Sequence, residues 1–285
     1  MRKVAIVTDT TACVPQEQVA KYDIEVVPVP LIINEKTYRD GIDITPTEFY
    51  AILRKAKRLP TTSASSPSPY LEAYRNASRK ADNILCLTEP SKFSAMYNSA
   101  RTAMETAKDI LPNVNIEVIE CVTAAAGQGL VALAAARAAA AEKTPDEVKQ
   151  IINSVMSRVN LFATLDTLQY LAKSGRVPQA AALVNSILNI KPVFTLNHAN
   201  PHTVGLPRTM KSAINHILKL MEEAVKREQQ LHVAVMHADA IKEAVILKDM
   251  ILSKFDCKEI YITEFTPVMG VHTGPGLVGV AFYGE

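Results

Sequence analysis

Hydroxyl side chains are concentrated in one uncharged segment, residues 59–69. Six of its eleven residues are Ser or Thr and three are Pro. Such a segment offers no strong base, but it can donate several hydrogen bonds. Ser66-Pro67 and Ser68-Pro69 are each typical of a helix N-cap followed by Pro at the first helical position. The hydroxyls are therefore predicted to lie beside a helix N-terminus, which favours an anion. The simpler interpretation is a serine-rich turn that only caps the helix.

Hydroxyl-bearing loops also follow the predicted buried strands of the first half of the chain. Apolar runs at residues 4–8, 83–87 and 115–121 are typical of strands in a parallel sheet. The loops after them carry Asp9, Thr10 and Thr11, then Ser91 and Ser94, then Thr123. Helices are predicted between and after the strands, over residues 15–21, 45–57, 70–80 and 95–111, in an Ala-rich run to residue 142, and over 146–157. Residues 24–33 form a further apolar stretch, and residues 36–43 a hairpin-like excursion.

This alternation of strand, loop and helix predicts a doubly wound, mainly parallel sheet with right-handed crossovers. In such sheets the loops after the strands meet at one edge, where ligands bind. An edge rich in hydroxyls and poor in charge suits one polar group of a largely apolar ligand.

The second half is predicted to be a separate α/β domain. Strands are expected over residues 161–165, 191–196, 201–205, 231–236, 257–263 and 277–283, with helices up to 172 and over 180–188, 208–230 and 239–254. The length of 285 residues favours two domains, which we place at residues 1–157 and 158–285. The second sheet is expected to be mixed, with a ligand cleft between the domains.

Residues 269–276 place three glycines around His272. Glycine allows close backbone approach or a positive φ, so His272 could donate to a carboxylate or phosphate, or act as a base. A turn between two strands is the simpler interpretation. The segment is neither a Walker loop nor a GxGxxG motif. His198 and His202 lie in a predicted turn without a third ligand, so we do not expect a metal site there.

Bulk composition excludes several classes of protein. The net charge of +2 gives no basic field for nucleic acid. The four cysteines are widely scattered, without the spacing of a zinc site or a disulfide framework. No signal peptide or membrane-spanning run is evident, so we expect a cytoplasmic protein without stable membrane insertion.

Several segments, in this order, resemble the DegV family over essentially the whole chain. They are VAIVTDTT (4–11), PTTS (60–63), KFSAMY (92–97), KSGRV (173–177), IKPV (190–193) and GVHTGPG (270–276). The resemblance implies a bacterial two-domain α/β protein that binds a long-chain fatty acid, such as palmitate, stearate or oleate, and uses no cofactor. It further implies a substrate-binding subunit without catalytic activity, which presents the fatty acid to a separate ATP-binding kinase subunit for acyl-phosphate formation.

The resemblance also implies a role for particular residues. The carboxylate would be held by Thr62, Ser63, Ser94, His272, Thr273 and Gly274. Arg176 is similar to an exposed arginine of the family that is implicated in docking to the kinase subunit. Ala64 and Ala95 depart from the family pattern, which usually has Gln and Gly at these positions.

Two other classes of function stay open. In a hydrolase or phosphotransferase acting on a small anion, Ser63 or Ser94 would be the nucleophile and His272 the base. Asp9 is then the obvious acidic partner, although neither serine lies in a GxSxG motif. A regulator whose lipid occupancy is the signal is the third class.

Overall fold

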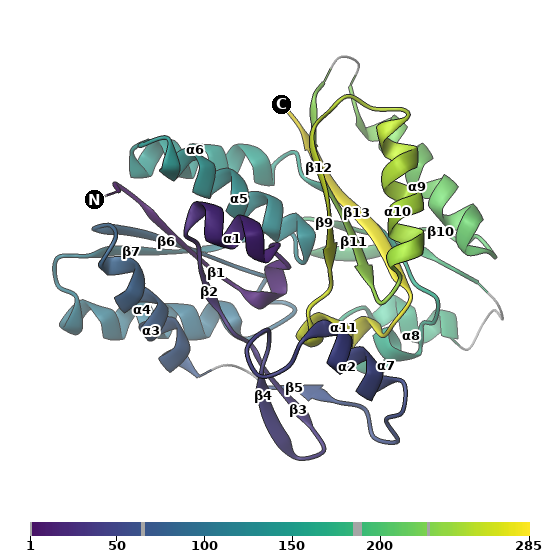
Figure 1. The fold of residues 1–285 in the computed structure, drawn as a ribbon, viewed down its shortest axis with the longest axis horizontal. Coiled ribbons are helices and arrows are strands. Elements are labelled where there is room, and N and C mark those ends of the chain that lie inside the picture. Colours follow the sequence, from purple (N-terminus) through teal and green to yellow (C-terminus); the bar gives the residue numbers. More distant parts are fainter. Residues whose placement is uncertain (1, 64–65, 185–189, 227–228) are drawn as a thin grey trace.

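The computed structural model of the chain describes residues 2–63, 66–184, 190–226 and 229–285. The strands of the described residues form three sheets, and helices cover the two larger sheets (Figure 1). The four-stranded sheet belongs to the first half of the chain and the six-stranded sheet to the second. This architecture confirms the predicted α/β fold with one parallel and one mixed sheet.

The first sheet is fully parallel, with strand order β2-β1-β6-β7. Its strands are β1 (Ala5–Asp9), β2 (Glu25–Val27), β6 (Asn83–Thr88) and β7 (Asn115–Glu120). The short apolar runs of β1 and β6 are buried on both faces, as is typical of central parallel strands. Successive residues alternate between the faces, so Ile6 and Val7 belong to different core clusters.

Helices cover both faces of this sheet, which is the doubly wound arrangement. Helices α3 (Pro67–Ser78) and α4 (Met96–Ile110) share one core cluster, and α5 (Ala126–Ala140) and α6 (Pro145–Met156) share another. The short elements η1 (Thr10–Ala12), α1 (Gln16–Tyr22) and α2 (Pro46–Leu53) complete the first half. Capping boxes begin α2, at Thr45 and Glu48, and α6, at Thr144 and Glu147.

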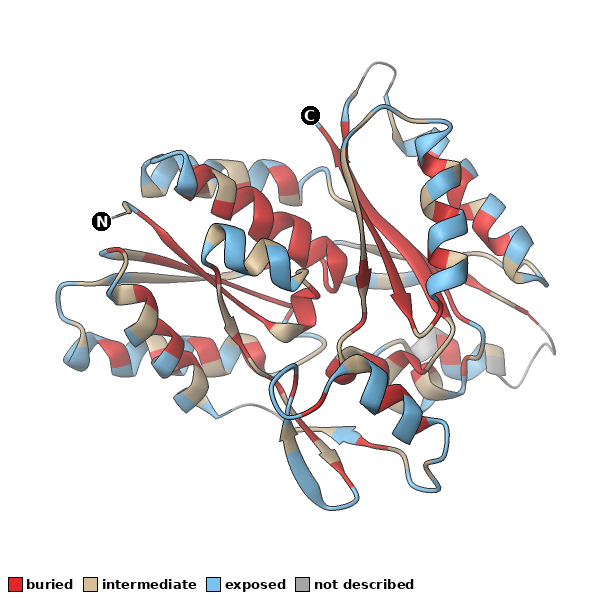
Figure 2. Cartoon of the chain, in the orientation of Figure 1, coloured by how far each residue is buried: buried red, intermediate tan, exposed pale blue. Residues whose placement is uncertain are grey.

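Helix α5 is buried on nearly every side, because it packs against β1 of the first sheet and against the second sheet. Figure 2 shows it as a largely buried helix in the centre of the molecule. Its alanine side chains allow close approach from both sides, and Leu130 and Leu133 fill the space between. The predicted Ala-rich helix is thus a packing element that joins the two halves.

The second sheet is mixed, with strand order β10-β9-β8-β13-β11-β12. Its strands are β8 (Asn160–Thr164), β9 (Val193–Asn197), β10 (Asn200–Gly205), β11 (Leu231–Ala238), β12 (Cys257–Glu264) and β13 (Leu277–Gly284). Only β11 and β12 run parallel among its neighbouring pairs. Helices α9 (Met210–Ala224) and α10 (Ile241–Leu252) cover its outer face, while α7 (Gln169–Ser174) and α8 (Pro178–Val184) lie at one end (Figure 1).

The apolar stretch at residues 24–33 contains two strands that belong to different sheets. β2 joins the first sheet, whereas β3 (Pro30–Ile33) pairs with β4 (Lys36–Arg39) in the predicted hairpin. The hydroxyl-rich segment supplies the third strand of this small sheet, β5 (Thr61–Thr62), which pairs with β3. The small sheet thereby holds Thr62 in a defined position, which the interpretation as a simple turn did not anticipate.

Two predicted elements differ from the structure. Residues 267–273 form a helix, α11 (Pro267–Thr273), where only a glycine-rich loop was expected. Helix α9 ends at Ala224, well before residue 230, because Val225 is already extended. Part of the helix predicted over residues 180–188 lies outside the described residues. The domain boundary between residues 157 and 158 stays a prediction, since one continuous core cluster contains residues from both halves.

The four cysteines are free thiols. Among the described residues, no group of His, Cys, Asp and Glu side chains is arranged to hold a metal ion. The helices of the described part of the chain are all too short or too polar to cross a membrane.

Candidate ligand-binding site

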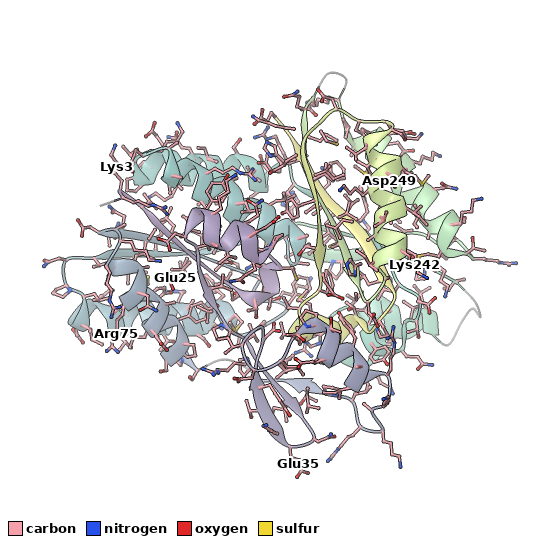
Figure 3. The ribbon with its side chains drawn as sticks, in the orientation of Figure 1. Lys3, Glu25, Glu35, Arg75, Lys242 and Asp249 are labelled. Carbon is pink, nitrogen blue, oxygen red and sulfur yellow. The ribbon has the colours of Figure 1, made fainter. Side chains whose placement is uncertain are left out.

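A cavity open to solvent is lined by residues of both halves, and its empty space, including solvent at the mouth, is about 1050 Å³. Most of its wall is apolar, and the second sheet supplies a large part of that apolar wall. The apolar lining residues on its strands include Leu161, Ala163, Phe194, Met236 and Leu277, and Leu165 directly follows β8. Arg75 and Lys242, which are labelled in Figure 3, are exposed on the outside of the molecule. Because most of its wall is apolar, the cavity suits a ligand with a long apolar part.

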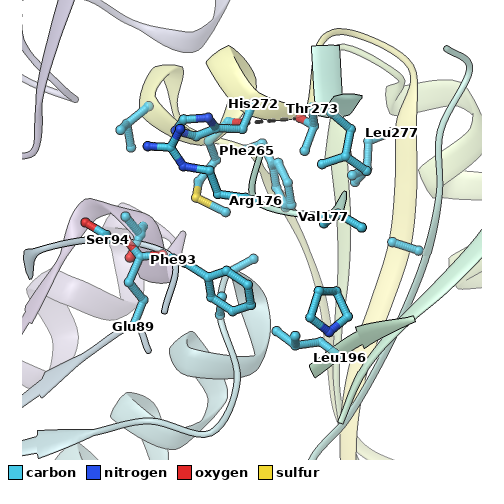
Figure 4. Close-up of a pocket in the computed structure, with 18 of the residues that line it drawn as sticks. Glu89, Phe93, Ser94, Arg176, Val177, Leu196, Phe265, His272, Thr273 and Leu277 are labelled. Atoms are coloured by element: carbon cyan, nitrogen blue, oxygen red, sulfur yellow. Dashed lines mark hydrogen bonds between the residues drawn. The ribbon is translucent and has the colours of Figure 1, made fainter. Parts of the chain in front are cut away.

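Six of the predicted site residues line this cavity, although they are widely separated in sequence. They are Thr62, Ser63, Ser94, Arg176, His272 and Thr273. Four different segments supply this polar wall: the end of β5, the loop after β6, the segment after α7 and helix α11. Their convergence gives the cavity one polar end, shown in Figure 4. Whether these residues bind a carboxylate stays a prediction.

Thr62 and His272 contact each other at this end, with Oγ1 and Nε2 3.2 Å apart. Burial, and then the positive charge of Arg176, lower the pKa of His272 to about 4. The imidazole is therefore neutral near pH 7 and carries one N–H. The hydroxyl of Thr62 and the neutral imidazole of His272 each carry one hydrogen that can be donated, and the hydrogen bond between them uses one of the two. One donor is left for a ligand, and the buried Nδ1 of His272 has no partner among the described residues.

Helix α11 positions His272 through a glycine in its middle, Gly270, and a glycine directly after its last residue, Gly274. A Cβ on Gly270 would lie 2.7 Å from the rings of Phe49 and Tyr50, so glycine permits the close packing of α11 on α2. Gly274 has φ +68°, and a Cβ there would lie 2.2 Å from the Tyr170 ring. These glycines are therefore needed for packing and for ending the helix.

Ser94 lies in the loop after β6, where its Oγ accepts from Met96 N at 3.3 Å. The Ser94 side chain also lies close to that of Glu89, whose charged form it favours. Glu89 is 7% exposed and lines the cavity beside Ser94 (Figure 4). Burial, together with the nearby charge of Asp9, raises the pKa of Glu89 to about 8. Glu89 was not among the predicted site residues, although its place directly after a buried strand could have indicated a position in the site.

The carboxylate of Asp9 forms hydrogen bonds with groups other than His272, the predicted base. Its carboxylate accepts from Thr11 N at 3.0 Å, from Thr11 Oγ1 and from Tyr70 OH at 3.1 Å. Burial raises the pKa of Asp9 in spite of these donors. In the described part of the chain Asp9 does not line the cavity, and the hydrogen bond of His272 is to Thr62. A nucleophile–base–acid relay through His272 and Asp9 is therefore not formed.

Arg176 follows Gly175, which ends α7 in the left-handed conformation with φ +71°. Its Nη1 donates to Ser174 O at 2.6 Å. The side chain is exposed, as expected, and yet it also lines the cavity. Its charge lowers the pKa of both His272 and Glu89, so it stands near both groups. Contact with a partner protein stays a prediction.

The remaining predicted residues lie apart from this polar end. Among the residues described, Gly274, Thr10, Ser91 and Thr123 do not line the cavity, whereas Thr11 does. Ser91 instead donates through N and Oγ to Glu120, at 2.6 and 2.7 Å. A role of Gly274 in holding a carboxylate stays a prediction, while Ala64 lies outside the described residues. Ala95 is exposed at the start of α4.

The fold and the site together define an α/β protein with an apolar cavity, one end of which presents hydroxyl and imidazole groups. The model of the DegV family, “Uncharacterised protein, DegV family”, matches residues 3–285. The chain therefore belongs to the DegV family, as its sequence motifs suggested.

Relatives of known structure share this fold over their whole length. A DegV family protein from Thermus thermophilus, solved in a study of its fatty acid binding, is 28% identical with a TM-score of 0.92 and full coverage of both chains. DegV from Bacillus subtilis, a fatty acid binding protein, is 26% identical with a TM-score of 0.88 and again full coverage. A further relative, found by sequence comparison, is a DegV domain-containing protein from Caldanaerobacter subterraneus, which is 30% identical over 99% of either chain.

Proposed function

We propose that this protein binds one long-chain fatty acid in the cavity, with the carboxylate at the polar end and the tail along the second sheet. The observation that carries this proposal is the division of one cavity into an apolar wall and one polar end, where hydroxyl and imidazole groups gather. Palmitate, stearate and oleate are the ligands we expect. Relatives that are 26–28% identical and share the fold bind fatty acids.

The tail supplies most of the affinity in this proposal. Each buried CH₂ is worth about 0.8 kcal/mol, and β8 and β13 line the cavity with Leu161, Ala163 and Leu277. The carboxylate needs only a few donors, since its hydrogen bonds are charge-assisted. The donors at Thr62, Ser63, Ser94 and His272 are neutral, which would hold the carboxylate oxygens less tightly than a bidentate arginine.

We further propose that the protein has no catalytic activity of its own and presents the carboxylate to a separate ATP-binding kinase subunit. Arg176 supports this proposal because it is exposed and lies near the polar end of the cavity. A partner that consumes ATP would place the function in the cytoplasm. Reversing the charge in Arg176→Glu should abolish partner binding and leave the bound lipid in place. If the Arg176→Glu variant bound the kinase subunit as tightly as the parent does, this role of Arg176 would be contradicted.

The first test of lipid binding is denaturing extraction of the purified protein, followed by mass spectrometry of the released small molecules. A fatty acid near one per protein supports the proposal and identifies the preferred tail. A protein that is empty and also takes up no added palmitate or oleate contradicts it.

The second test removes two hydroxyls from the polar end, in Thr62→Ala combined with Ser94→Ala. A hydrogen bond to a charged group is worth about 1.5–3 kcal/mol, so affinity should fall roughly 10- to 150-fold per bond. Thr61→Ala with Ser91→Ala is the matched control, because neighbouring residues lose the same hydroxyls outside the cavity. Equal fatty-acid affinity in both double variants would refute the assignment of this polar end.

A further inference from the structure

Glu89 is the one acidic side chain in the cavity wall formed by the described residues. An ionised carboxylate here would face the carboxylate of the fatty acid, and like charges at close range disfavour each other. The position is fixed, because Glu89 directly follows the buried strand β6, is itself buried and lies beside Ser94. A site for an anion therefore contains a group that must lose its negative charge.

The titratable and charged groups around Glu89 come from three other elements. Asp9 lies at the end of the neighbouring strand β1, Arg176 approaches from the segment after α7, and His272 lines the same cavity from α11. The imidazole of His272 is neutral above pH 7, so it does not change between pH 7 and 9.5. Burial raises the pKa of both carboxyl groups, but only Glu89 of the two lines the cavity. Glu89 is thus the carboxyl group whose charge a ligand carboxylate would oppose.

The protonation of Glu89 affects what Ser94 beside it can do for a ligand. Ser94 has one hydroxyl hydrogen, and its Oγ already accepts from Met96 N. An ionised Glu89 would compete with the ligand carboxylate for that hydrogen, whereas a protonated Glu89 would leave it for the ligand.

We propose that Glu89 is a positioning residue that must be protonated when the site holds a fatty-acid carboxylate, so that the protein takes up the carboxylate and a proton together. This inference rests on the proposed fatty-acid binding. Below the pKa of Glu89 the proton is already present and binding is independent of pH. Above it, one proton enters from solvent with each ligand, and affinity falls tenfold for each pH unit.

The test is calorimetric titration of the full chain with palmitate between pH 7 and 9.5, in two buffers of different ionisation enthalpy. We expect uptake that approaches one proton per palmitate at pH 9 and almost none at pH 7. Glu89→Gln should show no uptake and should bind palmitate several-fold to tenfold more tightly than the parent at pH 9, because its amide donates to Ser94 without titrating. Glu120→Gln makes the same change outside the cavity and should behave like the parent. Hexadecanol has the same tail and no charge, and its binding should take up no proton.

Each outcome bears on the inference in a defined way. Palmitate binding by the parent without proton uptake at pH 9 overturns it, and so does a Glu89→Gln variant with the pH dependence of the parent. The measurement on the parent is decisive even if Glu89→Gln does not fold. A parent that binds no palmitate at any pH defeats the proposed function itself, which is a different result from binding without a proton.

Discussion

Ala163 offers a direct test of where the acyl tail lies. It stands on β8 in the middle of the apolar wall. Gly279 of β13 packs against it so closely that a Cβ on Gly279 would lie 2.7 Å from the Ala163 Cβ. The three extra carbons of Ala163→Leu have no room on that side and must enter the cavity, where they displace a similar number of tail methylenes.

The expected loss follows from the tail carbons that are displaced. About three methylenes at about 0.8 kcal/mol each give about 2.4 kcal/mol, or roughly a 60-fold weaker affinity for the longest fatty acid that the parent accommodates. Fatty acids shorter by three or more carbons should bind the variant and the parent equally. Titration with saturated fatty acids of increasing length measures this difference.

Two controls separate this effect from general damage. Thermal unfolding without ligand reports whether Ala163→Leu disturbs the core, and Leu161→Ala, on the same face of β8, removes three carbons and should favour longer tails. An equal loss for every chain length would refute the placement of the tail, as would no loss at all.

Two further predictions concern stability and pH. Gly274→Ala should lower the unfolding free energy by about 1–3 kcal/mol or more, from positive-φ strain and the clash with Tyr170. Urea unfolding measures this loss. Gly41→Ala should lose less, because φ is +71° there too but a Cβ would meet only Thr10 Cγ2, at 4.0 Å. Equal losses in these two variants would argue against the clash. The ring of His272 should titrate near pH 4 by NMR rather than near 6.5, so the stability that its neutral form contributes is full above pH 6.5 and is lost as the pH falls through 4. A ring that titrates near 6.5 would show that the imidazole is not buried.

Local sequence was enough to predict the two sheets and most of the polar end. Buried apolar runs form strands whatever the rest of the chain does, and the loops after parallel strands must meet at one edge. Ser94 could be placed by this rule. The capping boxes at Thr45 and Thr144 were equally local, since each depends on a residue three positions away.

The features that were missed depend on contacts between distant segments. The glycines around His272 suggested a turn, because the sequence does not show that Phe49 and Tyr50 would pack against Gly270 in a helix. Glu89 looked like an ordinary loop residue, since its burial arises only when the second half of the chain closes over the end of β6. Tertiary packing overrides local preference at both positions.

The central place of β13 in the second sheet has a consequence for biosynthesis. This strand lies between β8 and β11, so residues 160–238 cannot complete their sheet until residues 277–284 have been made. His272, on α11, also precedes β13 by only a few residues. While the ribosome is still working through the second half, the edges of β8 and β11 that will pair with β13 have no partner. A nascent chain with unpaired strand edges is prone to aggregation, which makes it a natural client for chaperones. If the proposed function holds, the lipid can bind only after the last strand has been inserted.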